Sequence, residues 1–587
     1  MFIENFISGE VNKALNSIFN IELNETKVSV EYTKKDFEGD FTVNVFPFLK
    51  ITGGKPAEIA DKIGQFLLKL NPVFSKYNVV NGFLNISLSN NFWIETVFNE
   101  NEKELKPNTQ NIVIEFSSPN TNKPLHLGHI RNNLLGDSLS RILLANGNKV
   151  TRVNLVNDRG IHICKSMLAA KKWGKNFTPQ NQGIKGDKLV GNFYVQFDKE
   201  YKKQQEELIN EGKTKEEAEK NANLILEAAE MLRKWESNDK DIIELWKKMN
   251  DWVYQGFEKT YKTLGINFDK IYYESNTYKL GKDIILKGLE NKILTKRADG
   301  SVIADLTGEN LDEKVLLRAD GTSVYMTQDI GTAESRYNEF RPDKMIYVVG
   351  NEQNYHFNVL KIVLKKLGYN WAENINHFSY GMVELPDGKM KSREGTVVDA
   401  DDLIEEMIST AKKMSDELGK LDGFSKDEKN EIYRIIGLGA LKYYILKVDP
   451  KKNMVFNPAE SIDFNGNTGP FIQYTYARIN SLLSKSEQTV NNTEIANNEM
   501  NEGEKELTKL LSRFQTVIAD AGNKLSPAII ANYAYDLAKT YNQFYHENQV
   551  LKAEENERNF RLLLSKKTGE IIKESMFLLG IEVPSRM

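Results

Sequence analysis

Cysteine is nearly absent from this chain: Cys164 is the one cysteine in 587 residues. A single thiol excludes an internal disulfide and a zinc site built from cysteines, so we expect a reducing, cytoplasmic setting and no structural zinc. Long uncharged apolar runs are also missing, and we therefore expect no membrane span and no membrane partner. The first twenty residues carry acids early and alternate apolar with polar positions, so we expect neither a secretory signal nor a transit peptide.

A strong excess of one charge is missing as well. The 78 basic residues are balanced by 82 acidic ones, which gives a formal net charge of -4. This balance does not indicate general nucleic-acid binding, so an RNA partner would have to be recognised through local patches and specific contacts.

The chain is too long for one hydrophobic core, and its patterning predicts several domains. Residues 1–105 contain strand-like segments around an amphipathic helix, which indicates a small α+β domain. From residue 106 the order strand, loop, helix, strand predicts a parallel α/β sheet that extends to about residue 400. A charged, largely helical stretch at about 165–270 reads as an insertion into that sheet domain. Helical periodicity then continues almost to the end of the chain.

The most informative segment is SSPNTNKPLHLGH, residues 117–129, which joins a short apolar strand to a helix. It holds two of the six histidines, His126 and His129, separated only by Leu127 and Gly128. Such a turn lies where α/β proteins bind ligands, and a helix N-terminus favours phosphate. Gly128 lets an adenine or a phosphate approach the backbone, and two imidazole donors can stabilise charge on a reacting phosphate. The alternatives are helix-capping histidines or a zinc site, for which the loop offers no obvious further ligands.

The HLGH sequence resembles the HIGH motif of class I aminoacyl-tRNA synthetases. The longer string EFSSPNTNKPLHLGHIRNNLLGDSLSRIL, residues 115–143, resembles the arginyl-tRNA synthetase family in particular. The resemblance implies a Rossmann-like catalytic domain over 106–400 that binds ATP at all four HLGH residues. It also implies that Gly350 and Glu352 lie at the nucleotide.

A second basic segment, KMKSR at residues 389–393, resembles the KMSKS loop of the same family. A mobile basic loop can close on a triphosphate and neutralise the leaving pyrophosphate, although a solvated charged hairpin is the simpler interpretation of these residues alone. Ser392 stands where the motif has its second lysine, and both Met390 and Ser392 are expected at ATP. In this family a lysine upstream of the HIGH motif takes over part of the missing role. The candidate catalytic cations are therefore Lys123, Lys389, Lys391 and Arg393.

Recognition of arginine requires carboxylate and amide oxygens around a planar cation with five N–H donors. Tyr325 and Asp329 are four residues apart and would share one face of a helix. Taken without the resemblance, they would be a core aromatic residue and a surface acid. The resemblance implies an arginine pocket and places His356 near the nucleotide. The pocket would include Glu115, Ser117, Asn120, Tyr325, Asp329 and Gln353.

The resemblance extends to both ends of the chain. Residues 1–105 resemble the additional N-terminal domain of the family, which contacts tRNA. A helical stem over 401–460 would lead to a DALR-type anticodon-binding domain over 461–587. Aromatic residues at helical spacing there indicate mainly core packing, and Tyr474 and Arg478 are the candidates for contact with unpaired bases.

Together these features imply ATP-dependent ligation of L-arginine to tRNA(Arg) through an arginyl-adenylate, with Mg²⁺ accompanying ATP and the protein acting as a monomer. Two other classes remain open. Small nucleotidyltransferases also carry HxGH but are much shorter and lack a helical C-terminal domain. A non-catalytic RNA-binding relative would bind tRNA without activating arginine and would have an altered HLGH motif, whereas the motif here is intact.

Overall fold

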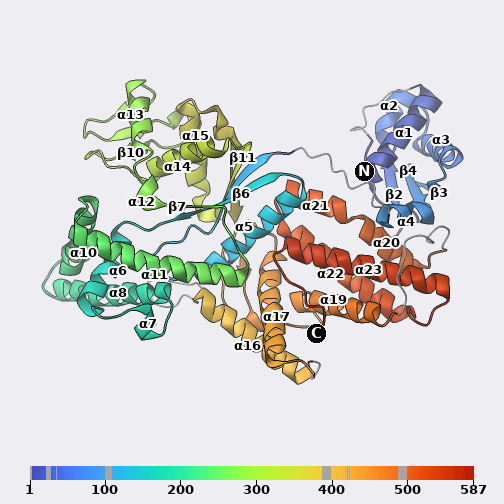
Figure 1. Ribbon diagram of the computed structural model, residues 1–587. Helices are drawn as coiled ribbons and strands as arrows, with labels where there is room; N and C mark the ends of the chain where they lie inside the picture. Colours follow the sequence, from blue (N-terminus) through green and yellow to red (C-terminus); the bar gives the residue numbers. More distant parts are fainter. Residues whose placement is uncertain are drawn as a thin grey trace.

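The computed structural model shows an N-terminal α+β domain, a central parallel sheet with a helical insertion, and a C-terminal helical bundle (Figure 1). The residues that it describes are 3–20, 28–34, 36–98, 109–386, 398–418, 421, 423–486 and 499–587. This architecture confirms the fold class expected from the sequence.

The N-terminal domain packs helices against an antiparallel sheet in the order β1-β2-β4-β3. Its elements are α1 (Ile3–Phe19), β1 (Val30–Tyr32), β2 (Phe41–Asn44), α2 (Leu49–Thr52), α3 (Pro56–Leu70), β3 (Phe74–Val80), β4 (Phe83–Leu88) and α4 (Asn90–Phe98). Helix α3 begins at a proline, which suits the first helical turn, and it buries Ile59, Ile63 and Leu67 at four-residue spacing. The expected domain boundary near residue 105 lies outside the described residues.

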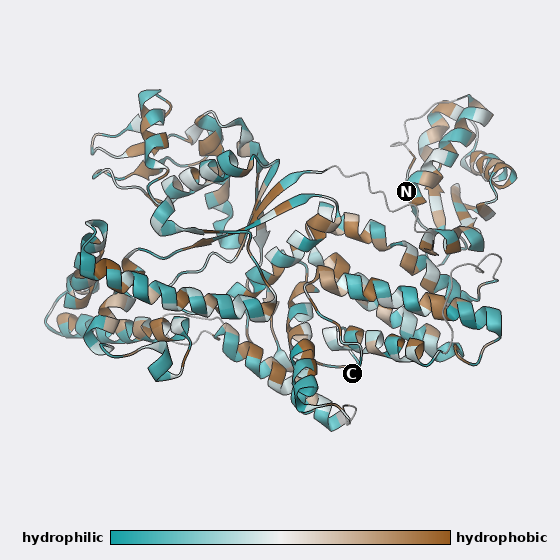
Figure 2. Cartoon of the chain, in the orientation of Figure 1, coloured by the Kyte–Doolittle hydropathy of each residue, from teal (hydrophilic) through white to brown (hydrophobic). Residues whose placement is uncertain are grey.

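The central sheet has five parallel strands in the order β12-β11-β5-β6-β7. The strands are β5 (Asn111–Glu115), β6 (Lys149–Val156), β7 (Lys270–Tyr273), β11 (Lys344–Gly350) and β12 (Ile375–Tyr380). Figure 2 shows hydrophobic residues concentrated on these strands. Ile112 and Ile114 of β5 face one core while Val113 faces another, so the central strand is buried on both sides, as expected for a parallel sheet.

The order of the strands creates a binding crevice. After β5 the chain runs through α5 (Leu127–Ala145) to β6 on one side, whereas β11 lies on the other side of β5. In open α/β sheets, ligands bind at the carboxyl ends of the strands where the strand order reverses. The loop that carries HLGH leaves β5 at this point.

The insertion between β6 and β7 is helical, as predicted. It comprises α6 (Ile161–Trp173), α7 (Pro179–Gln182), α8 (Gly186–Asn210), α9 (Lys215–Asn221), α10 (Asn223–Glu236) and α11 (Lys240–Leu264).

Between β7 and β11 the chain forms a small subdomain. Its elements are α12 (Glu274–Thr277), α13 (Lys282–Glu290), β8 (Thr295–Lys296), β9 (Val302–Ala304), β10 (Lys314–Leu317) and α14 (Tyr325–Phe340), and α15 (Asn354–Lys366) follows β11. Strands β8, β9 and β10 form a separate antiparallel sheet and do not extend the parallel one.

The remaining helices form the stem and the C-terminal bundle. They are α16 (Ala400–Leu418), α17 (Lys426–Leu446), α18 (Pro458–Ser461), α19 (Gly469–Ser484), α20 (Glu502–Ser512), α21 (Phe514–Asn523), α22 (Pro527–Glu547) and α23 (Glu555–Leu578), and a short strand pair joins β13 (Val383–Glu384) to β14 (Met454–Val455). The bundle contacts α5 directly, because the Ser138 hydroxyl donates to the Leu578 carbonyl at 2.9 Å. In the described part of the chain, no helix has both the length and the apolar character needed to cross a membrane.

Candidate active site

The two histidines of HLGH cap the helix that they begin. The His126 Nδ1 accepts a hydrogen bond from the Gly128 N–H at 3.1 Å, and the His126 N–H donates to the His129 Nδ1 at 3.2 Å. The two ring centroids lie 3.9 Å apart. The helix-capping alternative therefore describes the Nδ1 atoms correctly, but it accounts for only one nitrogen of each ring.

The capping hydrogen bonds at Nδ1 determine whether the Nε2 atom of each ring can donate to a ligand. Burial, followed by the positive charge of Lys123, lowers the pKa of the His126 imidazole to about 3. Burial, the neighbouring His126 and Lys123 hold the pKa of His129 well below its ordinary value. Both rings are therefore neutral near pH 7, and because each Nδ1 accepts a hydrogen bond, each proton resides on Nε2. No residue that the structure describes is hydrogen-bonded to either Nε2, so each ring retains one N–H donor for a ligand.

The turn between β5 and α5 is held in an unusual backbone conformation. Ser117 and Ser118 have φ values of 76° and 45°, a region that residues other than glycine rarely adopt. The Ser117 N–H donates to the Asn132 side chain at 2.5 Å, and the Ser118 N–H donates to the Asn154 side chain at 3.0 Å. The Ser117 hydroxyl lies 2.6 Å from the Tyr261 hydroxyl. Backbone strain that surrounding contacts hold in place is typical of functional sites.

Two residues of the expected arginine pocket lie at one cavity. Glu115 and Asp329 both line a cavity of about 30 Å³ beside α14. Glu115 already has a guanidinium partner, because it forms an ion pair with Arg336, whose side chain is fully buried. The cavity is too small for an arginine side chain, so a substrate guanidinium has to bind at its mouth or displace groups that line it.

The other expected pocket residues lie nearer the surface. Tyr325 is 70% exposed at the start of α14, and Gln353 is exposed in a short 3-10 turn after β11. Asn120 is half-buried and pairs with Asn157 of the loop after β6. His356 lies against Asp329, with its Nε2 2.6 Å from the Asp329 Oδ2. The structure therefore places His356 beside this carboxylate.

One carboxyl group of this region was missed by sequence reasoning. Glu274 directly follows β7, and burial raises the pKa of its carboxyl to about 7, with Arg159 acting against the shift and Asp158 and Asp329 adding to it. Glu274 and Asp329 therefore lie close enough to interact, and we call these two carboxyl groups the acidic group. Glu274 lies at the carboxyl end of a parallel strand, where ligands bind, but this position is evident only once β7 is placed in the sheet.

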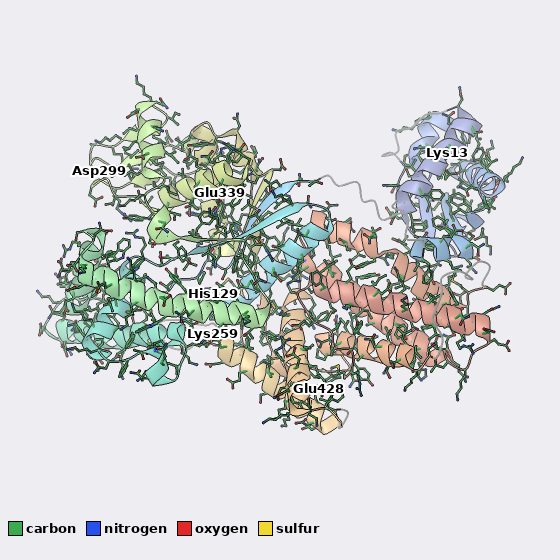
Figure 3. All side chains as sticks on the ribbon, viewed as in Figure 1. Lys13, His129, Lys259, Asp299, Glu339 and Glu428 are labelled. Carbon is green, nitrogen blue, oxygen red and sulfur yellow. The ribbon has the colours of Figure 1, made fainter. Side chains whose placement is uncertain are left out.

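The nucleotide side of the site is described in part. Gly350 ends β11 and Glu352 follows it, both at the carboxyl edge of the sheet near the crevice. Lys123 is close enough to both histidines for its charge to lower their pKa values. Figure 3 places His129 at the centre of the molecule, between the insertion and the C-terminal helices. The basic loop lies outside the described residues, and with it Lys389, Met390, Lys391, Ser392 and Arg393.

The two candidate RNA-contacting residues pack on each other in the C-terminal bundle. The Arg478 guanidinium lies 4.9 Å from the Tyr474 ring centroid and also bonds to the Asn542 side chain. Both side chains are half-buried. Tyr533, Tyr541 and Phe544 are buried, as expected for core packing, whereas Tyr545 is 37% exposed.

Metal-binding side chains are not clustered in the described ranges, where no group of three or more His, Cys, Asp and Glu residues is arranged to hold an ion. Cys164 is buried, and burial raises the pKa of its thiol to about 12, so this thiol is unreactive near neutral pH.

Protein-family models match this chain over most of its length. The model of the class I (R) tRNA synthetase catalytic domain matches residues 94–458. The DALR anticodon binding domain model matches residues 472–587, and the arginyl tRNA synthetase N-terminal domain model matches residues 5–88.

Individual proteins give the same result. Arginine–tRNA ligases of Bacteroides thetaiotaomicron and Phocaeicola vulgatus are each 56% identical to this chain, over 598 and 607 aligned residues, with 100% of both chains covered. The solved structure of Thermus thermophilus arginyl-tRNA synthetase shares the fold, with a TM-score of 0.80 over 100% of both chains at 24% identity. The catalytic-domain model alone spans more than half of the sequence, and the chain belongs to the arginyl-tRNA synthetase family of class I aminoacyl-tRNA synthetases.

Proposed function

We propose that this protein joins L-arginine to tRNA(Arg) at the expense of ATP. In the first step an oxygen of the arginine carboxylate attacks the α-phosphorus of ATP, a new P–O bond forms, and pyrophosphate leaves. In the second step a hydroxyl of the terminal tRNA ribose, the 2′-hydroxyl in class I enzymes, attacks the arginyl carbonyl, and AMP leaves. The hydroxyl proton passes to the phosphate or to water. Because each step is a direct attack of one substrate on another, no covalent enzyme intermediate is required.

The observation that carries this proposal is the pair of neutral imidazoles at the start of α5. Their Nδ1 atoms serve the helix cap, which leaves two Nε2–H donors at the ligand-binding edge of the sheet. Donors that are already oriented stabilise the extra negative charge of the displacement without reorganisation. We propose that Gly128 contacts the adenine, and that Gly350 and Glu352 hold the nucleotide from the side of β11. Leu127, expected at ATP from the sequence, is fully buried in the core and supports the loop from within.

Positive charge at the phosphates comes from Lys123 and, in this proposal, from the basic loop at residues 389–393, where Met390 and Ser392 also contact ATP. Mg²⁺ enters as part of the MgATP substrate, held mainly by phosphate oxygens and water, as is usual for this ion. Neutralisation of the leaving pyrophosphate by basic side chains lowers the barrier in the transition state.

The arginine side chain is proposed to bind at the mouth of the cavity that Glu115 and Asp329 line, next to the acidic group. Asp329 and Glu274 offer carboxylate oxygens to the guanidinium, and the exposed Tyr325 ring can stack on its plane. Asn120 and Gln353 would then face the α-amino and carboxylate end, and the buried Ser117, held by Tyr261, would support the turn behind them. Glu115 contributes through Arg336, whose buried charge it neutralises.

We further propose that the N-terminal domain and the C-terminal bundle bind the tRNA, with Tyr474 and Arg478 at unpaired anticodon bases. The domain limits 1–105, 106–400, 401–460 and 461–587, action as a monomer and a cytoplasmic location are part of this proposal.

The deciding experiment is ATP–pyrophosphate exchange with each of the twenty amino acids, with tRNA present. Exchange and charging of tRNA(Arg) with arginine alone support the proposal. Exchange with another amino acid contradicts the assignment of the acidic pocket, and adenylate transfer without any amino acid would indicate a nucleotidyltransferase.

A further inference from the structure

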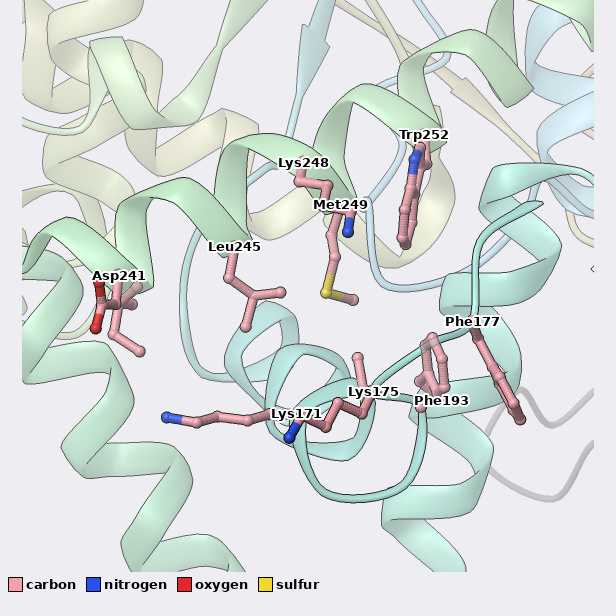
Figure 4. Close-up of a pocket in the computed structure, with 12 residues that line it drawn as sticks. Lys171, Lys175, Phe177, Phe193, Asp241, Leu245, Lys248, Met249 and Trp252 are labelled. Atoms are coloured by element: carbon pink, nitrogen blue, oxygen red, sulfur yellow. The ribbon is translucent and has the colours of Figure 1, made fainter. Parts of the chain in front are cut away.

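A second and larger cavity lies in the helical insertion, away from the HLGH loop. It has a volume of about 420 Å³ and is walled by the end of α6, the segment after it, α8 and α11 (Figure 4). Its apolar wall includes Phe177, Phe193 and Trp252. Phe193 is buried, whereas Phe177 is 43% exposed and available to a ligand. A volume of this size is typical of sites for small organic groups.

The backbone is adapted to this cavity at Gly174. A Cβ atom at that position would lie 2.3 Å from the ring of Phe193, which is closer than two non-bonded carbon atoms can approach. Glycine therefore allows the end of α6 to pass directly over the aromatic wall. A larger residue would clash with this ring.

Positive charge surrounds the apolar wall. Lys171, Lys175 and Lys248 line the cavity together with a single acid, Asp241. The Lys248 ammonium lies 5.1 Å from the centre of the Trp252 ring. Among the described residues these three lysines have no ion-pair partner, whereas neighbouring Lys172 is paired with Glu227 at 2.9 Å. The lining therefore carries an excess of positive charge next to flat aromatic surface.

This combination fits one chemical class, a flat aromatic group joined to a phosphate. Aromatic side chains stack on bases of any sequence, and nearby lysines attract the backbone phosphates of single strands. A base pair within a helix keeps its faces stacked and exposes only its edges, so only an unpaired nucleotide can use such a cavity.

One wall of the cavity is formed by α8, the helix that also contacts the segment before HLGH. Phe193 lines it from α8, and Gly191, two residues earlier on the same helix, packs against Pro124 just before HLGH. Helix α8 therefore lines the cavity and also contacts the segment that leads into HLGH.

We propose that the cavity between α6, α8 and α11 binds one unpaired nucleotide of the tRNA substrate, with its base on Trp252 and Phe177 and its phosphate at Lys171 and Lys175. This inference rests on the proposed function, because it requires an RNA substrate. It assigns a contact outside the adenylate-forming site and outside the anticodon-binding domain.

The test compares the full-length protein with variants of the lining. The affinity for a tRNA(Arg) transcript is measured at several salt concentrations for wild type, the double variant Lys171→Gln/Lys175→Gln, and Trp252→Leu. We expect the lysine variant to bind about tenfold more weakly, with the slope of log Kd against log salt reduced by about 0.7 for one single-strand phosphate. Trp252→Leu should lose about tenfold to a hundredfold in affinity, and Trp252→Phe should restore most of it.

Lys199→Gln/Lys213→Gln is the matched control, since it removes the same charge from exposed positions of the insertion outside the cavity. It should leave the salt slope unchanged. Arginylation at saturating tRNA should proceed at the wild-type kcat in the lysine variant, with only the KM for tRNA raised. This split distinguishes a binding contact from damage to the fold.

Three outcomes would overturn the proposal. If the lining variants bind tRNA as the control does while wild type charges tRNA normally, the cavity assignment alone is wrong. If AMP binds in a manner that depends on Lys171 and Lys175 while the affinity for tRNA is unaffected, the cavity is a site for free nucleotide. If wild type neither binds nor charges tRNA, the proposed function fails together with this inference.

Discussion

The carboxyl group of Glu274 provides a quantitative test of the acidic pocket. Its pKa is raised to about 7, so it is ionised in roughly 90% of molecules at pH 8 and roughly 10% at pH 6. If the guanidinium of arginine needs this carboxylate, the binding-competent fraction falls about tenfold between these two pH values. The KM for arginine should therefore rise by about tenfold, equivalent to about 1.4 kcal/mol of binding free energy.

The direction of the effect follows from the sign of the shift. A raised carboxyl pKa means that the neutral form persists to higher pH, so acid removes the attraction for the substrate cation. The histidines of HLGH do not compete as an explanation, because their lowered pKa values keep both rings neutral throughout this range. Binding of arginine should also lower the pKa of Glu274 and release a proton near pH 7.

The assay is the KM for arginine in tRNA charging between pH 6 and pH 8, with ATP and tRNA saturating. Glu274→Gln removes the titrating group and should give a high KM that no longer changes with pH, whereas Glu274→Asp should keep the dependence. Because His356 contacts Asp329 directly, His356→Asn serves as the control and should retain the dependence. A flat profile in wild type, or an unchanged profile in Glu274→Gln, would refute the assignment of this carboxyl to the pocket.

Three further predictions follow from named contacts. His129→Ala should slow adenylate formation by about 100-fold or more with little loss of tRNA affinity, since one oriented donor is removed; unchanged activation in single-turnover assays would disprove its role. Asp329→Ala should raise the KM for arginine at least tenfold or abolish charging, whereas an unaffected KM would exclude it from the pocket. Arg336→Met should lower the free energy of unfolding by about 3–5 kcal/mol in urea titration, because it leaves the Glu115 carboxylate buried without its partner, and the double variant Arg336→Met/Glu115→Leu should recover part of this loss. Equal stability of the single and double variants would show that the ion pair does not account for the loss.

Local patterns in the sequence predicted the elements that carry the nucleotide site. The apolar run before residue 116 and the helical spacing after residue 129 correspond to β5 and α5, because strand and helix periodicities are local properties. The two histidines lie at the start of α5, as predicted, since the turn and the helix start are encoded within a few residues.

Features that depend on distant contacts could not be predicted in this way. Glu274 joins Asp329 only because β7 returns to the sheet after an insertion of more than a hundred residues, and no local signal marks that return. Arg336 reads as an ordinary helical residue, yet the fold buries it against Glu115. The apolar residues 302–304 form a strand, but its pairing in a separate antiparallel sheet depends on partners elsewhere in the chain.

The central claim is that both HLGH imidazoles are neutral and carry their proton on Nε2, ready to donate to phosphate. Nitrogen NMR of the protein labelled with ¹⁵N-histidine tests it directly, with His126→Asn and His129→Asn used to assign the signals. We predict that both rings show the Nε2–H form, do not titrate between pH 5 and pH 8, and shift at Nε2 when ATP is added. A ring that titrates near pH 6.5, or that carries its proton on Nδ1, would contradict the account.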